Sequence, residues 1–197
     1  MKPIILTVGH SNHTLEHFLQ ILRANQVTAV ADIRSQPYSG HAPQFNREAL
    51  KSSLERSGID YVFLGDQLGA RPNDPACYSG NKVQYKLMAE TPLFQQGLKR
   101  VVAGSERHRI ALICTEKDPL ECHRSVLISQ GLEALGTDVS HILEDGTLEA
   151  QDEAMNRLLK QHRLNGPDLF RTKEQLLEEA CRRQEEQFAY ENPSIDN

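Results

Sequence analysis

RIALICTEKDPLECHR, residues 109–124, joins an almost unbroken apolar run to a cluster of chemically versatile side chains. A short continuous apolar run is typical of a central strand in a parallel sheet, because both faces of such a strand are covered. Asp118 and Pro119 suit the N-cap and the first position of a helix, and Glu121 completes a capping-box pattern. We therefore predict a buried strand over 109–115 and a helix that starts at Pro119.

Strand and helix patterns alternate on both sides of this segment. The further predicted strands cover 3–8, 27–33, 60–64 and 138–143, and the further predicted helices cover 14–25, 46–57, 83–90, 92–104 and 148–163. Such alternation implies a parallel sheet with helices on both faces and right-handed crossovers. The predicted fold class is α/β, a Rossmann-like three-layer sandwich with a mostly parallel sheet of about five strands and a C-terminal helical extension.

The charge of the chain changes near residue 144. Residues 1–143 hold 15 Lys and Arg against 14 Asp and Glu, whereas residues 144–197 hold 7 against 13. This balance does not favour broad nucleic-acid binding, which needs a basic surface. A helix with one apolar stripe is predicted from Thr172, where Thr172 and Gln175 fit a capping box. We expect a domain over 1–164 and a helical tail over 165–197, which packs on the domain or on a partner subunit in a homodimer.

Composition indicates a globular chain in a reducing compartment. Hydrophobic residues make up 39% and charged residues 25%, and no apolar run approaches the ~20 residues that span a bilayer. The first apolar stretch is too short for a signal peptide. Four cysteines are too few for a disulfide scaffold and are expected to stay thiols. The prediction is a soluble, cytoplasmic protein with no membrane partner.

Polar side chains follow four predicted strands at their carboxyl ends, where ligands bind in open parallel sheets. They are His10 and Ser11, then Asp32 and Arg34, then Cys114 and Glu116, and finally His141 and Asp145. We expect His10 and Asp32 to interact as an imidazole and a carboxylate that move protons, or His10 to bond its own turn. Gly9 belongs to no nucleotide fingerprint and is expected to serve a tight turn.

Cys114 and Cys122 are candidate nucleophiles, because the start of a helix lowers the pKa of a nearby thiol. Inert packing of both thiols is the alternative. Arg124 is predicted to face the sheet, where it needs an anion from Asp32, Glu116 or a substrate. Arg124 follows Cys114 by ten positions and Cys122 by two, which does not fit a phosphatase-like anion loop. The absence of a CxxC pair disfavours a metal site, and no cofactor is expected.

A long Gly-, Pro- and Asn-rich stretch over 65–82 carries Arg71 and Tyr78. Loops of this length and composition are usually functional or mobile. We predict a lid whose Arg71 and Tyr78 contact a ligand, with a rigid surface loop as the alternative.

The ordered motifs of the chain resemble a family known as domain of unknown function 488. They are TVGHS at 7–11, ADIRSQPYS at 31–39 with Phe45 following, YVFLGDQLGAR at 61–71, ALICTEKDPLECHR at 111–124 and HILEDG at 141–146. The resemblance implies an α/β fold with a shared polar cleft and carries no established reaction. By resemblance, the signature residues are His10, Ser11, Asp32, Arg34, Pro37, Cys114, Glu116, Cys122, His123 and Arg124.

The leading functional hypothesis is a hydrolase or group transferase acting on a small anionic substrate, including nucleotide-like or nucleic-acid-derived molecules. Cys114 or Glu116 would act as nucleophile or base, and His10 with Asp32 would move protons. The expected substrate contacts are Ser11, Arg34, Arg71, Tyr78, Cys122, His123 and Arg124. The competing hypothesis is a non-catalytic ligand or nucleic-acid binding module in which the cysteines only pack. A metal-binding protein ranks third.

Overall fold

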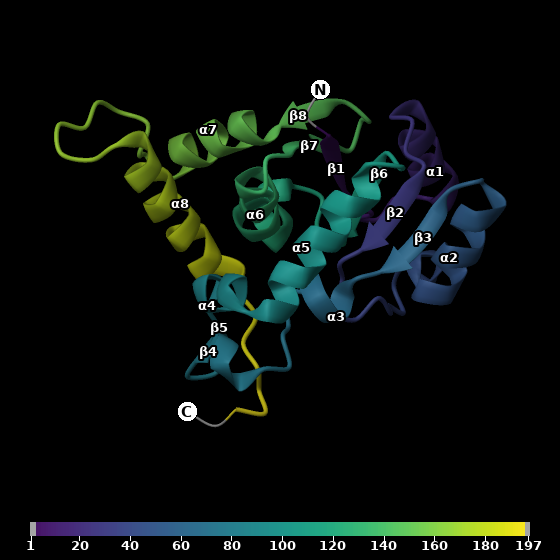
Figure 1. Cartoon of the computed structure of the whole chain (residues 1–197), viewed down its shortest axis with the longest axis horizontal. Helices are drawn as coiled ribbons and strands as arrows, with labels where there is room; N and C mark the ends of the chain where they lie inside the picture. The colour runs from purple at the N-terminus through teal and green to yellow at the C-terminus, as the bar shows by residue number, and fades with distance from the viewer. Residues whose placement is uncertain (1–2, 196–197) are drawn as a thin grey trace.

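A six-stranded sheet forms the centre of the structure, a computed structural model that describes residues 3–195 (Figure 1). Its strands, in spatial order, are β3 (Asp60–Phe63), β2 (Ala29–Asp32), β6 (Ile110–Cys114), β1 (Ile4–Gly9), β7 (Asp138–Ile142) and β8 (Leu148–Ala150). The first five pair in parallel, and β8 runs antiparallel to β7. The predicted mostly parallel α/β sheet is confirmed, with β6 buried at its centre.

Two helical layers cover the sheet. Helices α1 (Leu15–Ala24) and α2 (Arg47–Arg56) pack on one face, whereas α5 (Pro92–Ser105), α6 (Gln130–Ala134) and α7 (Gln151–Gln161) pack on the other. Successive strand residues point to opposite faces, so Leu6 belongs to the α1 and α2 core and Ile5 to the other core. Within residues 3–195 no helix is long and apolar enough to cross a membrane.

The connections that follow β1, β2 and β6 run to opposite faces of the sheet. The chain leaves β1 and β2 toward the face covered by α1 and α2, but it leaves β6 toward the opposite face. Where neighbouring strands continue to opposite faces, an open parallel sheet forms its ligand-binding crevice. Cys114, the last residue of β6, therefore stands at the position where this fold class holds a site.

The chain after β6 does not form the continuous helix that the capping pattern predicted. The Asp118 carboxylate does accept a hydrogen bond from the Leu120 N–H at 2.9 Å, but it caps only the short 3-10 helix η3 (Pro119–Glu121). Cys122 is then extended, with φ −140° and ψ 145°. The π-helical segment η4 (Arg124–Ser129) follows and continues into α6. The prediction of one helix from Pro119 was wrong because Cys122 interrupts it.

Residues 148–150 also differ from their predicted helix. They form β8, which pairs with β7 across a tight turn at Gly146, whose φ is +84°. The Asp145 carboxylate stabilises this turn by accepting a hydrogen bond from the Thr147 N–H at 2.9 Å. Helix α7 therefore begins three residues later than predicted, at Gln151.

The stretch after β3 contains short ordered elements. They are α3 (Gly65–Leu68), η2 (Pro75–Cys77), β4 (Tyr78–Ser79), β5 (Lys82–Val83) and α4 (Tyr85–Glu90), and the 3-10 turn η1 (Pro43–Phe45) lies earlier, before α2. The C-terminal helix α8 (Lys173–Phe188) begins with the predicted capping box and packs on α7, η3 and η4. The chain beyond α8 runs beside β5, where the Val83 N–H donates to the Tyr190 carbonyl at 3.0 Å. The tail thus packs back on the α/β body.

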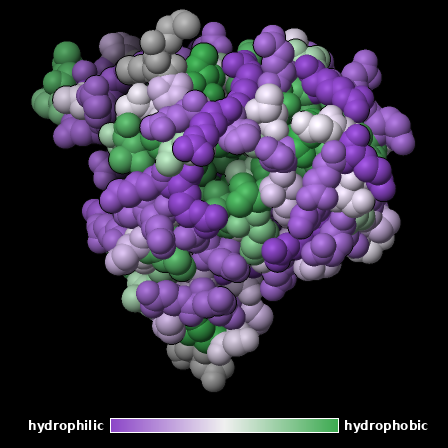
Figure 2. All heavy atoms as spheres, turned by 45° about the vertical axis from the view of Figure 1, so that its right-hand side comes forward, coloured by the Kyte–Doolittle hydropathy of each residue, from purple (hydrophilic) through white to green (hydrophobic). Residues whose placement is uncertain are grey.

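The surface beside β3 is hollowed and apolar. Figure 2 turns this side of the molecule forward and shows hydrophobic side chains in a hollow between polar ones. A pocket of about 250 Å³ between β3 and α5 is lined by residues that include Val62, Leu64, Val101 and Ile110. It lies along the sheet edge and includes none of the polar residues that follow β1 and β6.

Gly9 is needed for a close approach rather than for the predicted tight turn. A Cβ atom at Gly9 would lie 1.8 Å from the Glu116 carbonyl oxygen and 2.9 Å from Arg124 Nη1.

Gly9→Ala should therefore force these groups apart and lower the midpoint of thermal unfolding. Overpacking costs ~1–3 kcal/mol, and each kcal/mol lowers the midpoint of a chain this size by ~2–4 °C. Gly40→Ala is the control, since a Cβ there meets nothing within 4 Å. Equal melting of both variants would contradict this role.

Candidate functional site

Two cysteines, a glutamate and a histidine meet just beyond the end of β6. Cys122 Sγ lies 2.9 Å from Cys114 Sγ, and Cys114 Sγ lies 2.9 Å from Glu116 Oε2. His123 Nδ1 lies 3.5 Å from Cys122 Sγ. Cys114 is 4% exposed and Cys122 is 2% exposed. Four residues of the segment 114–123 that the sequence singled out thus form one cluster around two buried thiols, which we call the thiol site.

Arg124 shapes the loop that carries the thiol site. Its side chain is completely buried, Nη1 donates to the Glu116 carbonyl at 2.7 Å and Nη2 donates to the Lys117 carbonyl at 2.9 Å. These partners differ from the expected ones, because they are backbone carbonyls rather than the carboxylates of Asp32 or Glu116. The Nε–H is buried without a partner. The guanidinium therefore fixes the loop from within and is already engaged.

His123 is held by a second hydrogen bond on the far side of its ring. Its Nε2 lies 2.9 Å from the Leu68 carbonyl oxygen in α3. A carbonyl only accepts, so Nε2 carries a hydrogen and Nδ1 faces the thiols with its lone pair or with a second proton. An imidazole oriented in this way suits a general base beside a nucleophile, and it also suits a metal ligand.

The electrostatics of the thiol site favour one thiolate. The hydrogen bond from Cys122, and then the nearby His123, outweigh burial and lower the pKa of Cys114 to about 6. Burial, and then Cys114 itself, raise the pKa of Cys122 well above its ordinary value. Burial lowers the pKa of His123, but Cys114 and then Glu116 raise it overall. At neutral pH this favours a Cys114 thiolate that accepts a hydrogen bond from the Cys122 thiol.

Two further ionisable groups border the thiols. Burial raises the pKa of Glu116, but hydrogen bonds from the protonated Cys114 thiol and then from Cys122 lower it overall, and the bond from Cys114 is lost when that thiol ionises. Tyr85 is only 4% exposed, and burial, followed by the Cys122 thiol, raises the pKa of its phenol. Tyr85 was not identified from the sequence, because it stands in an amphipathic helical pattern with no polar motif around it.

Asp32 is engaged by partners other than the expected imidazole. Its carboxylate accepts from Arg34 Nε at 2.9 Å, from Arg34 Nη2 at 2.6 Å and from the Tyr61 hydroxyl at 2.8 Å. His10 Nδ1 instead lies 2.9 Å from the Ser11 carbonyl oxygen, which is the alternative turn contact. Tyr61 was missed because it lies inside a strand pattern.

His10 and Cys114 follow adjacent strands but face different layers. The His10 ring stacks on Phe45 of the α1 and α2 layer with 4.4 Å between ring centroids, whereas Cys114 belongs to the opposite core. Burial, and then the charge of Arg34, lower the pKa of His10 to about 4, so the ring is neutral. His123 is therefore the imidazole that lies beside the thiols.

The other polar residues singled out from the sequence have partners within the protein. Ser11 Oγ donates to Asn12 Oδ1 at 3.3 Å, and the Tyr78 hydroxyl donates to the Pro72 carbonyl at 2.8 Å. Arg71 is exposed, with its guanidinium 4.7 Å from the Tyr190 ring centroid. Arg71 and Tyr78 both line a polar pocket of about 140 Å³. His141 is buried between the Thr7 hydroxyl at 2.8 Å and Gln151 Oε1 at 2.7 Å.

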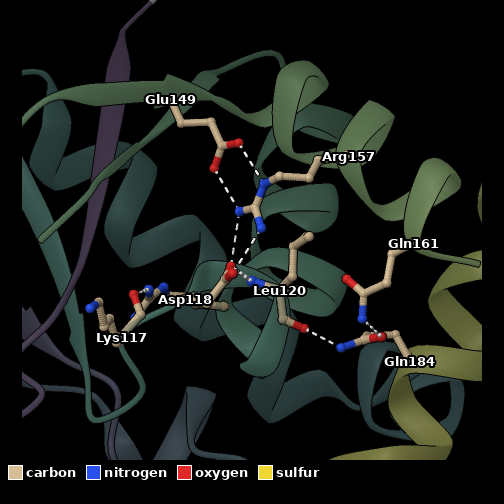
Figure 3. A network of polar contacts seen from close by, with 8 residues as sticks. Lys117, Asp118, Leu120, Glu149, Arg157, Gln161 and Gln184 are labelled. Atoms are coloured by element: carbon tan, nitrogen blue, oxygen red, sulfur yellow. Dashed lines mark hydrogen bonds and ion pairs between the residues drawn. The ribbon is translucent and has the colours of Figure 1, made fainter.

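An ion-pair network anchors the loop on its other side (Figure 3). Arg157 of α7 points between Asp118 and Glu149 and donates to both carboxylates at 2.8–2.9 Å. An open cleft of about 710 Å³ beside it is lined by five carboxylates, those of Asp118, Glu121, Glu144, Asp145 and Glu149, against Lys117 and Arg157. The cleft is thus acidic. Arg157 was missed because it looks like an ordinary charge on an exposed helix face.

The comparisons with known proteins identify a family without a described activity. The family model described as "Domain of unknown function DUF488" matches residues 14–130, a segment that contains β2, β3, β6 and the whole thiol site. No curated protein and no solved structure matches the chain.

The thiolate assignment predicts how alkylation depends on pH. Only the thiolate reacts, so the rate of Cys114 modification by iodoacetamide should rise with pH through about 6 and then level off. Cys181 is the control, because burial raises the pKa of its thiol to about 11. Peptide mass spectrometry gives the pH midpoint of the alkylation rate for each cysteine. Burial slows the reaction but does not move this midpoint. A Cys114 midpoint at or above that of a free thiol, ~8.5, would refute the assignment.

Proposed function

The chain belongs to the DUF488 family, and we propose that it is a thiol-dependent hydrolase or group transferase whose covalent step takes place at Cys114. The observation that carries this proposal is the position of the Cys114 thiol at the carboxyl end of β6, 2.9 Å from the Cys122 thiol, which in turn lies 3.5 Å from His123 Nδ1. A thiol with a lowered pKa and an oriented imidazole are the two parts that nucleophilic catalysis requires.

The reaction would proceed in two steps. The Cys114 thiolate attacks an electrophilic carbonyl carbon or phosphorus atom of the substrate, and the bond from that atom to the leaving group breaks. His123, protonated beside the thiolate, gives its proton to the leaving group. A water molecule, or an acceptor hydroxyl in a transferase, then loses a proton to the neutral imidazole and attacks the thioester or thiophosphate. This releases the product and restores the Cys114 thiolate.

Recognition of an anionic substrate would depend on Arg71. Arg34 and Arg124 are already bonded within the protein, to the Asp32 carboxylate and to backbone carbonyls. Arg71 is exposed and lines a polar pocket. It lies three residues after Leu68, whose carbonyl orients His123. The acidic cleft beside Arg157 weighs against a long polyanion such as nucleic acid. A small anionic substrate is therefore favoured.

Activated esters test the covalent step. Wild-type protein mixed with p-nitrophenyl acetate or p-nitrophenyl phosphate should release a burst of about one p-nitrophenol per chain and carry the acyl or phosphoryl group on Cys114. Cys114→Ser should slow the release by more than ~100-fold, because a serine hydroxyl is not ionised here, whereas Cys77→Ser should behave as wild type. Arg71→Ala should raise the KM for the phosphate ester only. Release that survives Cys114→Ser would rule out this nucleophile.

The same cluster also supports a second candidate, a metal centre. The ligand atoms of Cys114, Cys122 and His123 lie within 4.8 Å of one another. Two thiolates and an imidazole suit zinc, and Glu116 could supply a fourth ligand. The hydrogen bond from His123 to the Leu68 carbonyl resembles the outer contact that metal-bound histidines make. The sequence disfavoured a metal because these ligands come without short paired spacing.

Elemental analysis decides between the two candidates. Protein purified without an affinity tag or chelator should contain clearly less than one zinc or iron per chain if the thiol enzyme is correct. One metal per chain, lost in Cys122→Ser and kept in Cys181→Ser, would make the metal centre the function instead.

A further inference from the structure

The two sulfur atoms of the thiol site are close to bonding distance. Cys114 Sγ and Cys122 Sγ are 2.9 Å apart, and a disulfide needs ~2.05 Å between sulfurs, so a shift of ~0.9 Å would join them. Cys181 has different neighbours, since its Sγ lies 4.0 Å from Met155 Sδ and 3.0 Å from Gln130 Nε2. Cys114 and Cys122 are therefore the cysteine pair placed for a reversible bond.

The backbone around Cys122 allows this shift. Cys122 is extended between η3 and η4, so no regular helix fixes its position. The two backbone hydrogen bonds that hold it are long, with the Cys122 N–H 3.3 Å from the Pro119 carbonyl and the Ser125 N–H 3.3 Å from the Cys122 carbonyl. The π-helical turn that follows is a conformation found often at functional sites. Cys122 can thus approach Cys114 without breaking a helix.

We propose that Cys122 is a resolving thiol, which closes on Cys114 to form a disulfide when a small hydroperoxide oxidises the site. Cys114 attacks one peroxide oxygen, an S–O bond forms, the O–O bond breaks and the leaving oxygen departs as water or alcohol. Cys122 then attacks Cys114 Sγ, the S–O bond breaks and the hydroxide leaves as water. Two thiols and one hydroperoxide give one disulfide, one water and one water or alcohol.

The environment assigns the two roles. Cys114 is the attacking sulfur because it accepts the hydrogen bond from Cys122 and is fixed at the end of β6, whereas Cys122 lies in the extended break between η3 and η4 and can move toward it. His123, in contact with Cys122 Sγ, is placed to take the proton that Cys122 loses when it attacks. Exposures of 4% and 2% favour a small hydroperoxide over a bulky one. The inference rests on the same Cys114 thiolate as the proposed function and adds its regulation, since the disulfide removes the nucleophile.

Oxidation of the full chain tests the resolving role. Reduced protein treated with equimolar hydrogen peroxide and quenched with N-ethylmaleimide should lose two hydrogens, with Cys114 joined to Cys122 in the digest. Dithiothreitol should reverse the change. Cys122→Ser should instead carry a sulfenic acid on Cys114 that dimedone traps, and it should form sulfinic acid at least ten times faster than wild type. Cys77→Ser is the matched control, because Cys77 is equally buried but outside the thiol site.

Three outcomes would overturn the inference. They are sulfinic acid at Cys114 that forms as fast in wild type as in Cys122→Ser, a disulfide that uses Cys77 or Cys181, and no oxidation of either thiol. The proposed function fails by a different observation, the absence of an ester-derived adduct on Cys114 of the reduced protein. The two failures can therefore be told apart.

Discussion

The buried guanidinium of Arg124 is the constraint on which the thiol site depends. Its planar fork reaches the carbonyls of Glu116 and Lys117 together, which a lysine ammonium could not do with the same geometry. These bonds turn the loop back over the end of β1, where only the missing side chain of Gly9 leaves room for the Glu116 carbonyl. The loop held in this way places Glu116 Oε2 and Cys122 Sγ each 2.9 Å from Cys114 Sγ.

The difference between local patterns and long-range contacts explains what the sequence could and could not predict. Apolar runs act locally, so the five parallel strands, their alternation with helices and the burial of β6 were predicted correctly, whereas β8 and the break after η3 were not. The break at Cys122 occurs where this residue contacts Cys114, and no local pattern encodes that contact. The missing contact from His10 to Asp32 has a similar origin, because Arg34 and Tyr61 compete for the carboxylate. Residues placed at one edge by topology can still face opposite layers.

Fewer arginines around the site are available to bind an anion than the sequence suggests. A sequence with several arginines near strand ends indicates anion binding, yet a guanidinium already bonded to a carboxylate or to carbonyls offers little to a ligand. In this chain Arg34, Arg124 and Arg157 are all engaged internally, whereas Arg71 remains exposed. The acidic cleft beside Arg157 repels polyanions further. Affinity for an anion would thus come from one cation and local hydrogen bonds, which favours a small ligand.

The proposed catalysis, metal binding and disulfide formation would each use the same three side chains, in different protonation and oxidation states. With one proton shared between the sulfurs, Cys114 would be a nucleophile with an adjacent thiol donor. Loss of that second proton would create a dithiolate, which a buried site tolerates only when a cation such as zinc neutralises it. Loss of two electrons joins the sulfurs and removes both charges. Because burial strongly opposes the dithiolate, the singly ionised pair is the state that this protein matrix favours without a metal.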